Sequence, residues 1–204
     1  MHPLGETPQR LHRLQRQALR QRIWGYFPTP PALARRLALL LTTHPGEAVL
    51  DPSGGSGELL DAVQTSCPTV CCEAAECAPT LAALLRGKGY AVLADDMYAL
   101  RHTGRRWPRI VANPSFHDYE DARQTIEAVE QLLAPGGRSV GIVSAGTLWH
   151  DDARSQSFWA WLRRWRAHTF DLPATAFLTG VRPVAVRTCC VIIDRPTEEC
   201  PSIG

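Results

Sequence analysis

Short apolar runs alternate with stretches of helical character through most of this 204-residue chain. The runs are apolar at nearly every position instead of every second one, which indicates strands buried on both faces of a parallel sheet. Parallel strands need crossover connections, and helices between the strands supply them. We therefore expect an α/β domain with helices on both faces of its sheet. The strands are expected at 47–52, 69–74, 90–96, 109–114, 139–145, 168–173 and 184–194.

The last two runs flank a glycine-containing turn, which predicts a hairpin with an antiparallel strand at one edge of the sheet. The predicted sheet is thus seven-stranded and mostly parallel. Thr29 precedes two prolines, a good helix start because the N–H that proline lacks would have no partner there. The helices are expected at about 31–41, 58–63, 78–89, 119–134 and 152–166.

The composition is that of a soluble globular domain, with 45% apolar and 21% charged residues. No apolar run approaches the roughly 18 residues that a membrane helix needs, and the N-terminus lacks the apolar core of a signal peptide. The seven cysteines are an odd number, so we expect a reducing cytoplasm and no disulfide framework. Four of them lie close together, but their spacing and the lack of a nearby histidine do not predict a metal site. These four are Cys67, Cys71, Cys72 and Cys77.

The N-terminal segment is strongly basic, although the net charge of the whole chain is only +2. Residues 9–22 hold five arginines and no acid, and Leu11, Leu14 and Ala18 recur at helical spacing. This pattern predicts a basic amphipathic helix. Two interpretations stay open, because the arginines either bind nucleic-acid phosphate or form a solvated face.

Polar residues follow four of the predicted strands, and ligands of open α/β sheets bind beyond such carboxyl ends. The first strand leads into the loop Asp51–Gly57, whose glycines let the backbone approach a ligand closely. The helix that follows this loop offers free N–H groups, while Asp51 suits a cationic or amine-bearing ligand. The other three strands end at Glu73, at Asp95 and Asp96, and at Asn113–Phe116.

These motifs, in this order, resemble those of the class I S-adenosylmethionine-dependent methyltransferases, in particular the N6-adenine DNA methyltransferases. The family pattern runs F-x-T-P, D-P-x-x-G-x-G, an acid after the second strand, an aspartate after the third, and N/D-P-P-Y/F after the fourth. Its matches here are Phe27–Pro30, Asp51–Gly57, Glu73, Asp95 or Asp96, and Asn113–Phe116. The resemblance covers about residues 24–195 and implies a Rossmann-like fold. Residues 1–23 are then a basic helical extension, and residues 196–204 a tail.

The resemblance also implies a site for S-adenosylmethionine. Glu73 would accept hydrogen bonds from the ribose hydroxyls. Asp95 or Asp96 would accept one from the adenine amine, and Asp96 is favoured because the pair Met97–Tyr98 follows it. The residues implied to hold the amino-acid part are Phe27, Thr29, Asp51, Pro52, Ser53, Gly55 and Gly57.

The chemistry of amine methylation explains why a motif such as Asn113–Pro114 is needed. An exocyclic amine on an aromatic ring is a poor nucleophile, because its lone pair is delocalised into the ring. Two acceptors directed at its hydrogens favour the tetrahedral geometry that attack on a methylsulfonium requires. By the resemblance, these acceptors are the side-chain oxygen of Asn113 and the carbonyl of Pro114. Phe116 would stack on a base flipped out of the duplex.

The sequence departs from the family pattern in two ways. Ser115 stands where the family has its second proline, which keeps the Pro114 carbonyl but removes a fixed φ from the loop. No long segment is available for target recognition either. Target choice is therefore expected from the basic helix at 9–22, from the aromatic and arginine-rich segment 158–166, or from a partner chain. That partner would be a specificity subunit or a second copy.

Alternative functions stay open. Similar motifs occur in enzymes that methylate RNA guanine amines or a protein glutamine amide, and these would share the chemistry but not the substrate. Ser115 and the missing recognition segment instead motivate a non-catalytic methyltransferase-like module that binds a partner or nucleic acid. The arginine-rich N-terminus favours nucleic acid, and DNA first. We expect neither a metal nor a membrane among the partners.

Overall fold

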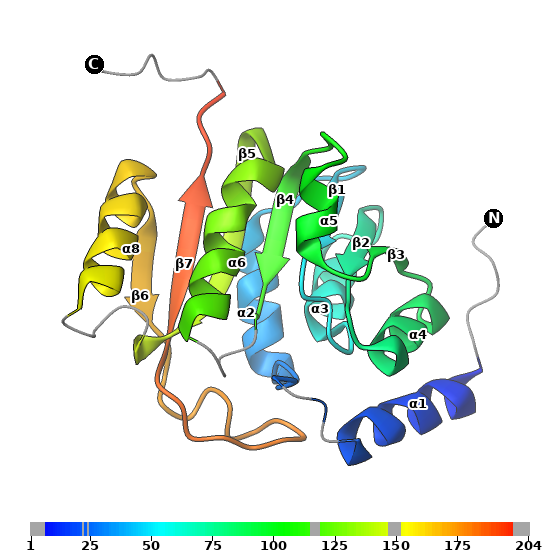
Figure 1. The fold of residues 1–204 in the computed structure, drawn as a ribbon. Helices are drawn as coiled ribbons and strands as arrows, with labels where there is room; N and C mark the ends of the chain where they lie inside the picture. The colour runs from blue at the N-terminus through cyan, green and yellow to red at the C-terminus, as the bar shows by residue number, and fades with distance from the viewer. Residues whose placement is uncertain (1–6, 22, 24, 115–118, 147–151, 198–204) are drawn as a thin grey trace.

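The computed structural model describes residues 7–21, 23, 25–114, 119–146 and 152–197. Its centre is one seven-stranded sheet with the strand order β3-β2-β1-β4-β5-β7-β6 (Figure 1). All seven predicted strands are present, and all but β5 lie within about four residues of their predicted runs; β5 begins at Leu133, six residues before its predicted start. They are β1 (Ala48–Asp51), β2 (Cys71–Ala75), β3 (Ala91–Ala94), β4 (Trp107–Ala112), β5 (Leu133–Ser144), β6 (His168–Asp171) and β7 (Thr188–Asp194).

The directions of the strands confirm the predicted mostly parallel sheet. Strands β1 to β5 pair in parallel, whereas β7 runs antiparallel to both β5 and β6. The antiparallel strand itself is not outermost, because β7 lies between β5 and β6. Burial explains this order, since the first six residues of β7 are buried while β6 is exposed at both ends. A fully apolar strand belongs inside the sheet, and a polar one suits its edge.

Helices cover both faces of the sheet (Figure 1). On one face, Leu37 of α2 and Leu60 of α3 pack with Val111 of β4. On the other, Phe158 of α8 packs with Ile110, the neighbour of Val111 in the same strand. Successive strand residues point to opposite faces, so one strand serves both cores. The described helices are α1 (Pro8–Arg20), α2 (Pro31–Leu41), α3 (Glu58–Ser66), α4 (Pro79–Gly87), α5 (Met97–Arg101), α6 (Tyr119–Leu132) and α8 (Ala153–Arg164).

Some element ends differ from the prediction. Helix α6 ends at Leu132, two residues before its predicted end, whereas α2 spans its predicted range. The N-cap of α2 is Pro30 and not Thr29. The Thr29 hydroxyl instead accepts a hydrogen bond from Asn113, far along the chain. Helix α5 was not expected, because five residues are too few to show helical periodicity. It is capped by Asp96, whose side chain accepts from the Ala99 N–H at 2.9 Å.

The basic N-terminal segment forms the predicted helix, and α1 packs against α4. Ala18 of α1 is fully buried with Leu81 of α4 and Tyr26. The Thr80 hydroxyl donates to the side chain of Gln21 at 2.9 Å. Figure 1 shows α1 beside α4, away from the sheet.

Within the described ranges, no helix has the length and apolar character needed to cross a membrane. No group of three or more histidine, cysteine, aspartate or glutamate side chains in these ranges could hold a metal ion.

Candidate active site

A cavity opens at the carboxyl ends of β1 to β4, the lower end of the sheet in Figure 1. The strand order reverses between β1 and β4, and ligands of open α/β sheets bind at such a reversal. The cavity is lined by segments that are far apart in the sequence: 25–29, 51–55, 75–77, 95–98 and 113–114. Ten of the residues predicted from the sequence lie in this lining. They are Phe27, Thr29, Asp51, Pro52, Ser53, Gly55, Asp95, Asp96, Asn113 and Pro114.

Two glycines shape the loop after β1. A Cβ at Gly54 would lie 2.8 Å from a methyl of Leu85 and 3.0 Å from the Cβ of Ala74, so a side chain there would push the loop off β2 and α4. Gly57 is the N-cap of α3 and has φ of +86°, a conformation that favours glycine. Gly57 is not part of the cavity lining, so it shapes the loop from outside the cavity.

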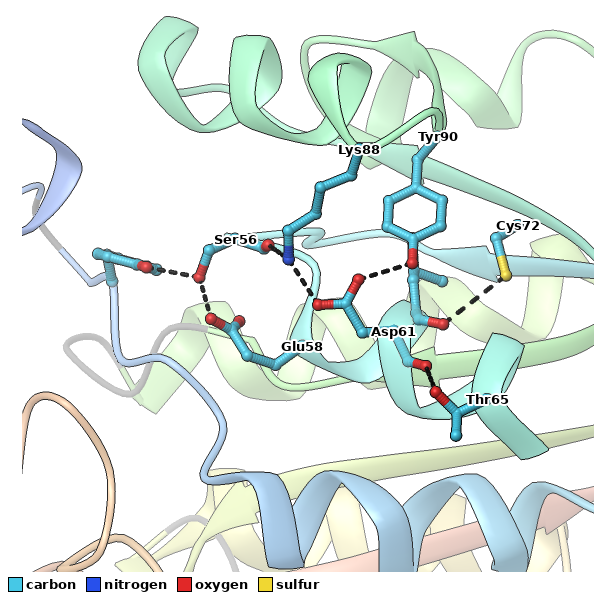
Figure 2. A network of polar contacts seen from close by, with 9 residues as sticks. Ser56, Glu58, Asp61, Thr65, Cys72, Lys88 and Tyr90 are labelled. Carbon is cyan, nitrogen blue, oxygen red and sulfur yellow. Dashed lines mark hydrogen bonds and ion pairs between the residues drawn. The ribbon is translucent and has the colours of Figure 1, made fainter. Parts of the chain in front are cut away.

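A polar network holds this loop in place (Figure 2). The hydroxyls of Tyr26 and Ser56 lie 2.5 Å apart in a buried hydrogen bond. Lys88, the single lysine of the chain, donates to the Ser56 carbonyl at 2.6 Å and to an Asp61 oxygen at 2.5 Å. Tyr90 donates to the other Asp61 oxygen at 2.7 Å. The network ties the loop to α3, to the α4–β3 connection and to the segment before α2.

Asp51 is a buried carboxyl at the cavity wall, with 2% of its surface exposed. It accepts hydrogen bonds from the Ser53 N–H at 3.0 Å and from the Ser53 hydroxyl at 3.4 Å. Burial, and to a lesser extent the negative charge of Glu76, raise the pKa of Asp51 to about 7. A cation placed beside this carboxyl would favour its ionised form.

The cavity lining contains two further carboxyls, Glu58 and Glu76, which the sequence analysis did not identify. Glu76 accepts from the backbone N–H groups of Gly55 and Ala78, both at 2.8 Å, and so joins the loop to the start of α4. Glu58 is hydrogen-bonded to the Ser56 hydroxyl. Burial raises the pKa of both glutamates. The carboxyls of the lining are therefore Asp51, Glu58, Glu76, Asp95 and Asp96, a set that favours a cationic ligand.

The placement of Glu73 in the cavity was wrong. Strand β2 continues to Ala75, so Glu73 lies in its middle, and its side chain is not part of the lining. One of its oxygens accepts from Arg105 and from the Trp107 indole N–H, each at 2.6 Å. These two donors allow an acid to be buried inside a strand. The acid at the carboxyl end of β2 is Glu76.

Asp95 and Asp96 are both exposed at the rim of the cavity. One oxygen of Asp96 caps α5, whereas Asp95 precedes the cap position. Both carboxyls are within the lining, so both stay candidates for the predicted contact with the adenine amine.

Asn113, at the end of β4, has a fixed orientation. Its Nδ2 donates to the Phe27 carbonyl at 3.2 Å and to the Thr29 hydroxyl at 2.9 Å. The opposite orientation of the amide would place Oδ1 against the Phe27 carbonyl, and these two acceptors cannot form a hydrogen bond. The Asn113 Oδ1 atom is buried and has no hydrogen-bond partner among the described residues. Leaving such an acceptor unpaired costs about 1–3 kcal/mol, and a donor from a ligand would remove that cost.

The β6–β7 connection secures the segment that orients Asn113. Arg182 donates to the Tyr26 carbonyl at 2.7 Å, and its guanidinium lies 4.7 Å from the centre of the Phe27 ring. A Cβ at Gly180 would lie 3.2 Å from Pro30, so the connection packs tightly on this segment. In Figure 1 the connection runs in orange along the lower end of the sheet.

Ser115 and Phe116 lie outside the described residues, and their predicted roles stay predictions. Sequence reasoning missed Tyr26, Glu58, Glu76 and Arg182. Only Glu76 had a usable signal, because the apolar character of the second strand continues through Ala75 and Glu76 is the first acid beyond it.

No protein-family model matches the sequence, and no similar protein is found among curated ones. Solved structures do resemble it. The methyltransferase subunit of a type I restriction-modification system from Streptococcus thermophilus superposes with a TM-score of 0.67 at 17% identity, over 83% of this chain and 44% of that one. The type I restriction enzyme M protein M.EcoKI superposes with a TM-score of 0.64 at 15% identity, over 85% of this chain and 45% of that one. An O-methyltransferase from Bacillus cereus, in complex with SAH, superposes with a TM-score of 0.62 at 11% identity, over 93% of this chain and 92% of that one.

The strand order, the antiparallel β7 and these likenesses identify the fold. The chain has the fold of the class I S-adenosylmethionine-dependent methyltransferases, as its motifs predicted. It spans less than half the length of the two restriction-modification subunits named above.

Proposed function

We propose that this chain is an S-adenosylmethionine-dependent methyltransferase that acts on an exocyclic amine, adenine N6 in DNA. The observation that carries the proposal is the buried Oδ1 atom of Asn113, a fixed acceptor without a partner among the described residues, beside the cavity. Asn113 and Pro114 both line that cavity, as an amine-binding motif at the end of β4 requires.

The cavity residues fit S-adenosylmethionine. Five carboxyls suit its positive charge, and the close packing at Gly54 leaves the loop backbone facing the cavity. In this assignment Asp51 binds the ammonium group, Glu76 takes the ribose role first given to Glu73, and Asp95 or Asp96 accepts from the adenine amine. S-adenosylmethionine, when bound, supplies an electrophilic methyl group carried on a sulfonium.

The chain's own residues prepare the amine. The Asn113 Oδ1 atom and the Pro114 carbonyl accept one N–H each, which draws the nitrogen away from the planar geometry in which its lone pair is delocalised. Both oxygens also stabilise the positive charge that develops on nitrogen as the methyl group is transferred. Phe27 and Thr29 hold the Asn113 amide, so its orientation is set before substrate arrives.

DNA as the substrate is supported by two independent observations. Two of the structures with this fold are type I restriction-modification methyltransferase proteins. The described part of α1 is rich in arginine and has no acid, which suits a polyanion.

The proposal is tested by offering methyl-labelled S-adenosylmethionine with unmethylated DNA, RNA and a protein extract in parallel reactions. We expect label in DNA with the native chain, and labelling about 10²–10³-fold slower with Asn113→Ala. Label found only in RNA or only in protein would show that this polymer, and not DNA, is the substrate. A folded chain that binds S-adenosylmethionine but labels no polymer would support the non-catalytic alternative.

Arg182 is expected to act as a positioning residue. Arg182→Met removes the hydrogen bond to the Tyr26 carbonyl and the cation above the Phe27 ring, which loosens the segment that orients Asn113. Misplaced groups lower the rate even when binding persists, so the rate constant at saturating substrates should fall about tenfold, with the DNA KM nearly unchanged. Single-turnover kinetics measures both quantities.

Arg187→Met is the matched control for this prediction. Arg187 lies in the same connection, its side chain is 78% exposed, and its ion pair with Asp171 is 4.0 Å long. Its loss should leave the rate constant within about twofold of the native value, as for a surface ion pair. Equal rates for the two variants would refute a positioning role for Arg182.

A further inference from the structure

The outward face of α1 carries a row of arginines. Arg13, Arg16 and Arg20 are exposed, and they line a shallow groove along the helix with Gln9, His12 and Gln17. The helix contains no acidic residue, so none of its own side chains neutralises this charge. Every polar side chain that lines the groove is thus basic, an amide or an imidazole.

The opposite face of α1 is anchored, so the arginines have a fixed direction. Ala18 is fully buried with Leu81 of α4, and Leu19 and Ile23 pack partly buried beside them. Thr80 of α4 donates to Gln21 just after the helix. A helix held in this way presents its arginines without an ordering step when a partner binds.

The spacing of the arginines matches a phosphate backbone. Arg13 and Arg20 are seven residues apart, which is about 10 Å along a helix axis. One strand of duplex DNA carries a phosphate at about every 3.4 Å of its axis, so three guanidiniums on this face reach separate phosphates. Arginine also binds phosphate oxygens in a bidentate manner, which lysine cannot do.

The row lies next to the cavity. Helix α1 ends at Arg20, and Ile23, Gly25 and Tyr26, a few residues further, already line the cavity. A duplex held on α1 would therefore lie beside the cavity that Asn113 lines.

We propose that the outward face of α1 binds the phosphate backbone of duplex DNA and holds the substrate at the cavity. The inference rests on the proposed function in taking DNA as the polymer. A membrane surface fits less well, because a helix that lies on lipid needs a free apolar face. Here the apolar side is in use, with Ala18 buried and Leu11, Leu14 and Leu19 partly covered.

The test compares DNA binding of the native chain with that of the triple variant Arg13→Gln/Arg16→Gln/Arg20→Gln. Glutamine keeps helix propensity near that of arginine, so α1 is retained. Each phosphate contact contributes about −0.9 to the slope of log K against log salt, so losing three should make the slope shallower by about 2.7. Between about 50 and 200 mM salt, the native affinity should then fall about 40-fold more than the variant affinity.

A second triple variant, Arg35→Gln/Arg106→Gln/Arg187→Gln, removes the same charge from exposed positions on α2, just before β4 and in the β6–β7 connection. Its salt slope should stay within about one unit of the native slope. An equal loss in both triple variants would overturn the proposal, because binding would then follow net charge and not this face. Tighter binding to duplex RNA, or to vesicles of anionic phospholipid, than to duplex DNA would also overturn it.

Methyl transfer separates this inference from the proposed function. Asn113→Ala should bind DNA with the native salt slope while transferring the methyl group about 10²–10³-fold more slowly. If the native chain methylates DNA and the α1 variant keeps the native DNA KM and salt slope, the α1 proposal alone fails. If the native chain binds DNA through α1 but transfers no methyl group to it, the proposed function fails, while the proposal that the outward face of α1 binds DNA stands.

Discussion

Replacing Asn113 by alanine is expected to lower the rate constant of methyl transfer by about 10²–10³-fold, the usual effect of removing one charge-stabilising hydrogen bond in a transition state. The affinity for S-adenosylmethionine should change by less than about twofold, because the lost oxygen serves the amine and not the cofactor. The fold should persist, since the variant also removes a buried acceptor that has no partner among the described residues. Single-turnover transfer and calorimetric binding give the two values separately.

Thr29→Val is the matched variant for this prediction. It removes one of the two acceptors that hold the Asn113 amide but leaves Oδ1 in place. A smaller loss of rate, about tenfold, is expected from an amide that is less well oriented. If Asn113→Ala abolished cofactor binding together with transfer in a folded protein, the separation of roles at the end of β4 would be wrong.

The affinity for S-adenosylmethionine is expected to rise with pH below neutrality, because the pKa of Asp51 is raised to about 7. If only the ionised carboxylate binds the ammonium group, the affinity at pH 6 should be about eightfold lower than at pH 7.5. An α-amino group with a pKa of about 7.7–8.0 is partly deprotonated at pH 7.5, which reduces the expected difference to about five- to sixfold. Titration calorimetry at pH 6 in buffers of different ionisation enthalpy should show the release of close to one proton.

The same raised pKa has the opposite effect on the stability of the free chain. Between the ordinary carboxyl pKa near 4 and about 7, the folded state holds a proton that the unfolded state has lost, so the free energy of unfolding falls as pH rises. Asp51→Asn carries no charge and still offers an acceptor to Ser53. At pH 7.5 it should therefore unfold at higher urea than the native chain, while binding the cofactor at least about tenfold more weakly.

Asp51→Asn also provides the control for the pH dependence. The pKa values of Glu58 and Glu76 are raised by burial as well, so a weaker dependence of the same sign should remain. A variant with the full native pH dependence would show that Asp51 is not the titrating group.

The strands of the sheet were predicted well because the apolar pattern of each strand is contained in a few consecutive residues. A run such as residues 188–193, apolar at nearly every position, is typical of a strand buried on both faces. The glycine loop and Asn113 were also found, because residues that follow such strands meet at one end of a parallel sheet. Helix α5, by contrast, is too short to leave a periodic pattern.

The errors in the site have a different physical origin. Glu73 and Glu76 are three residues apart, and choosing between them requires the end of β2 to be known to the residue. In the structure Glu76 lines the cavity, whereas Glu73 is paired with Arg105 and Trp107, which no local pattern reveals. Arg182 lies more than 150 residues from the carbonyl that it binds, so only the folded chain brings them together.

The most direct test of the central claim identifies the methylated base. DNA treated with the native chain and methyl-labelled S-adenosylmethionine is digested to nucleosides, and the nucleosides are separated by chromatography. We predict that the label elutes with the nucleoside of N6-methyladenine, and that Asn113→Ala gives about 10²–10³-fold less of it in the same time. Label on a ring carbon of cytosine, or on any position other than an exocyclic amine, would contradict the role given to Asn113 and Pro114.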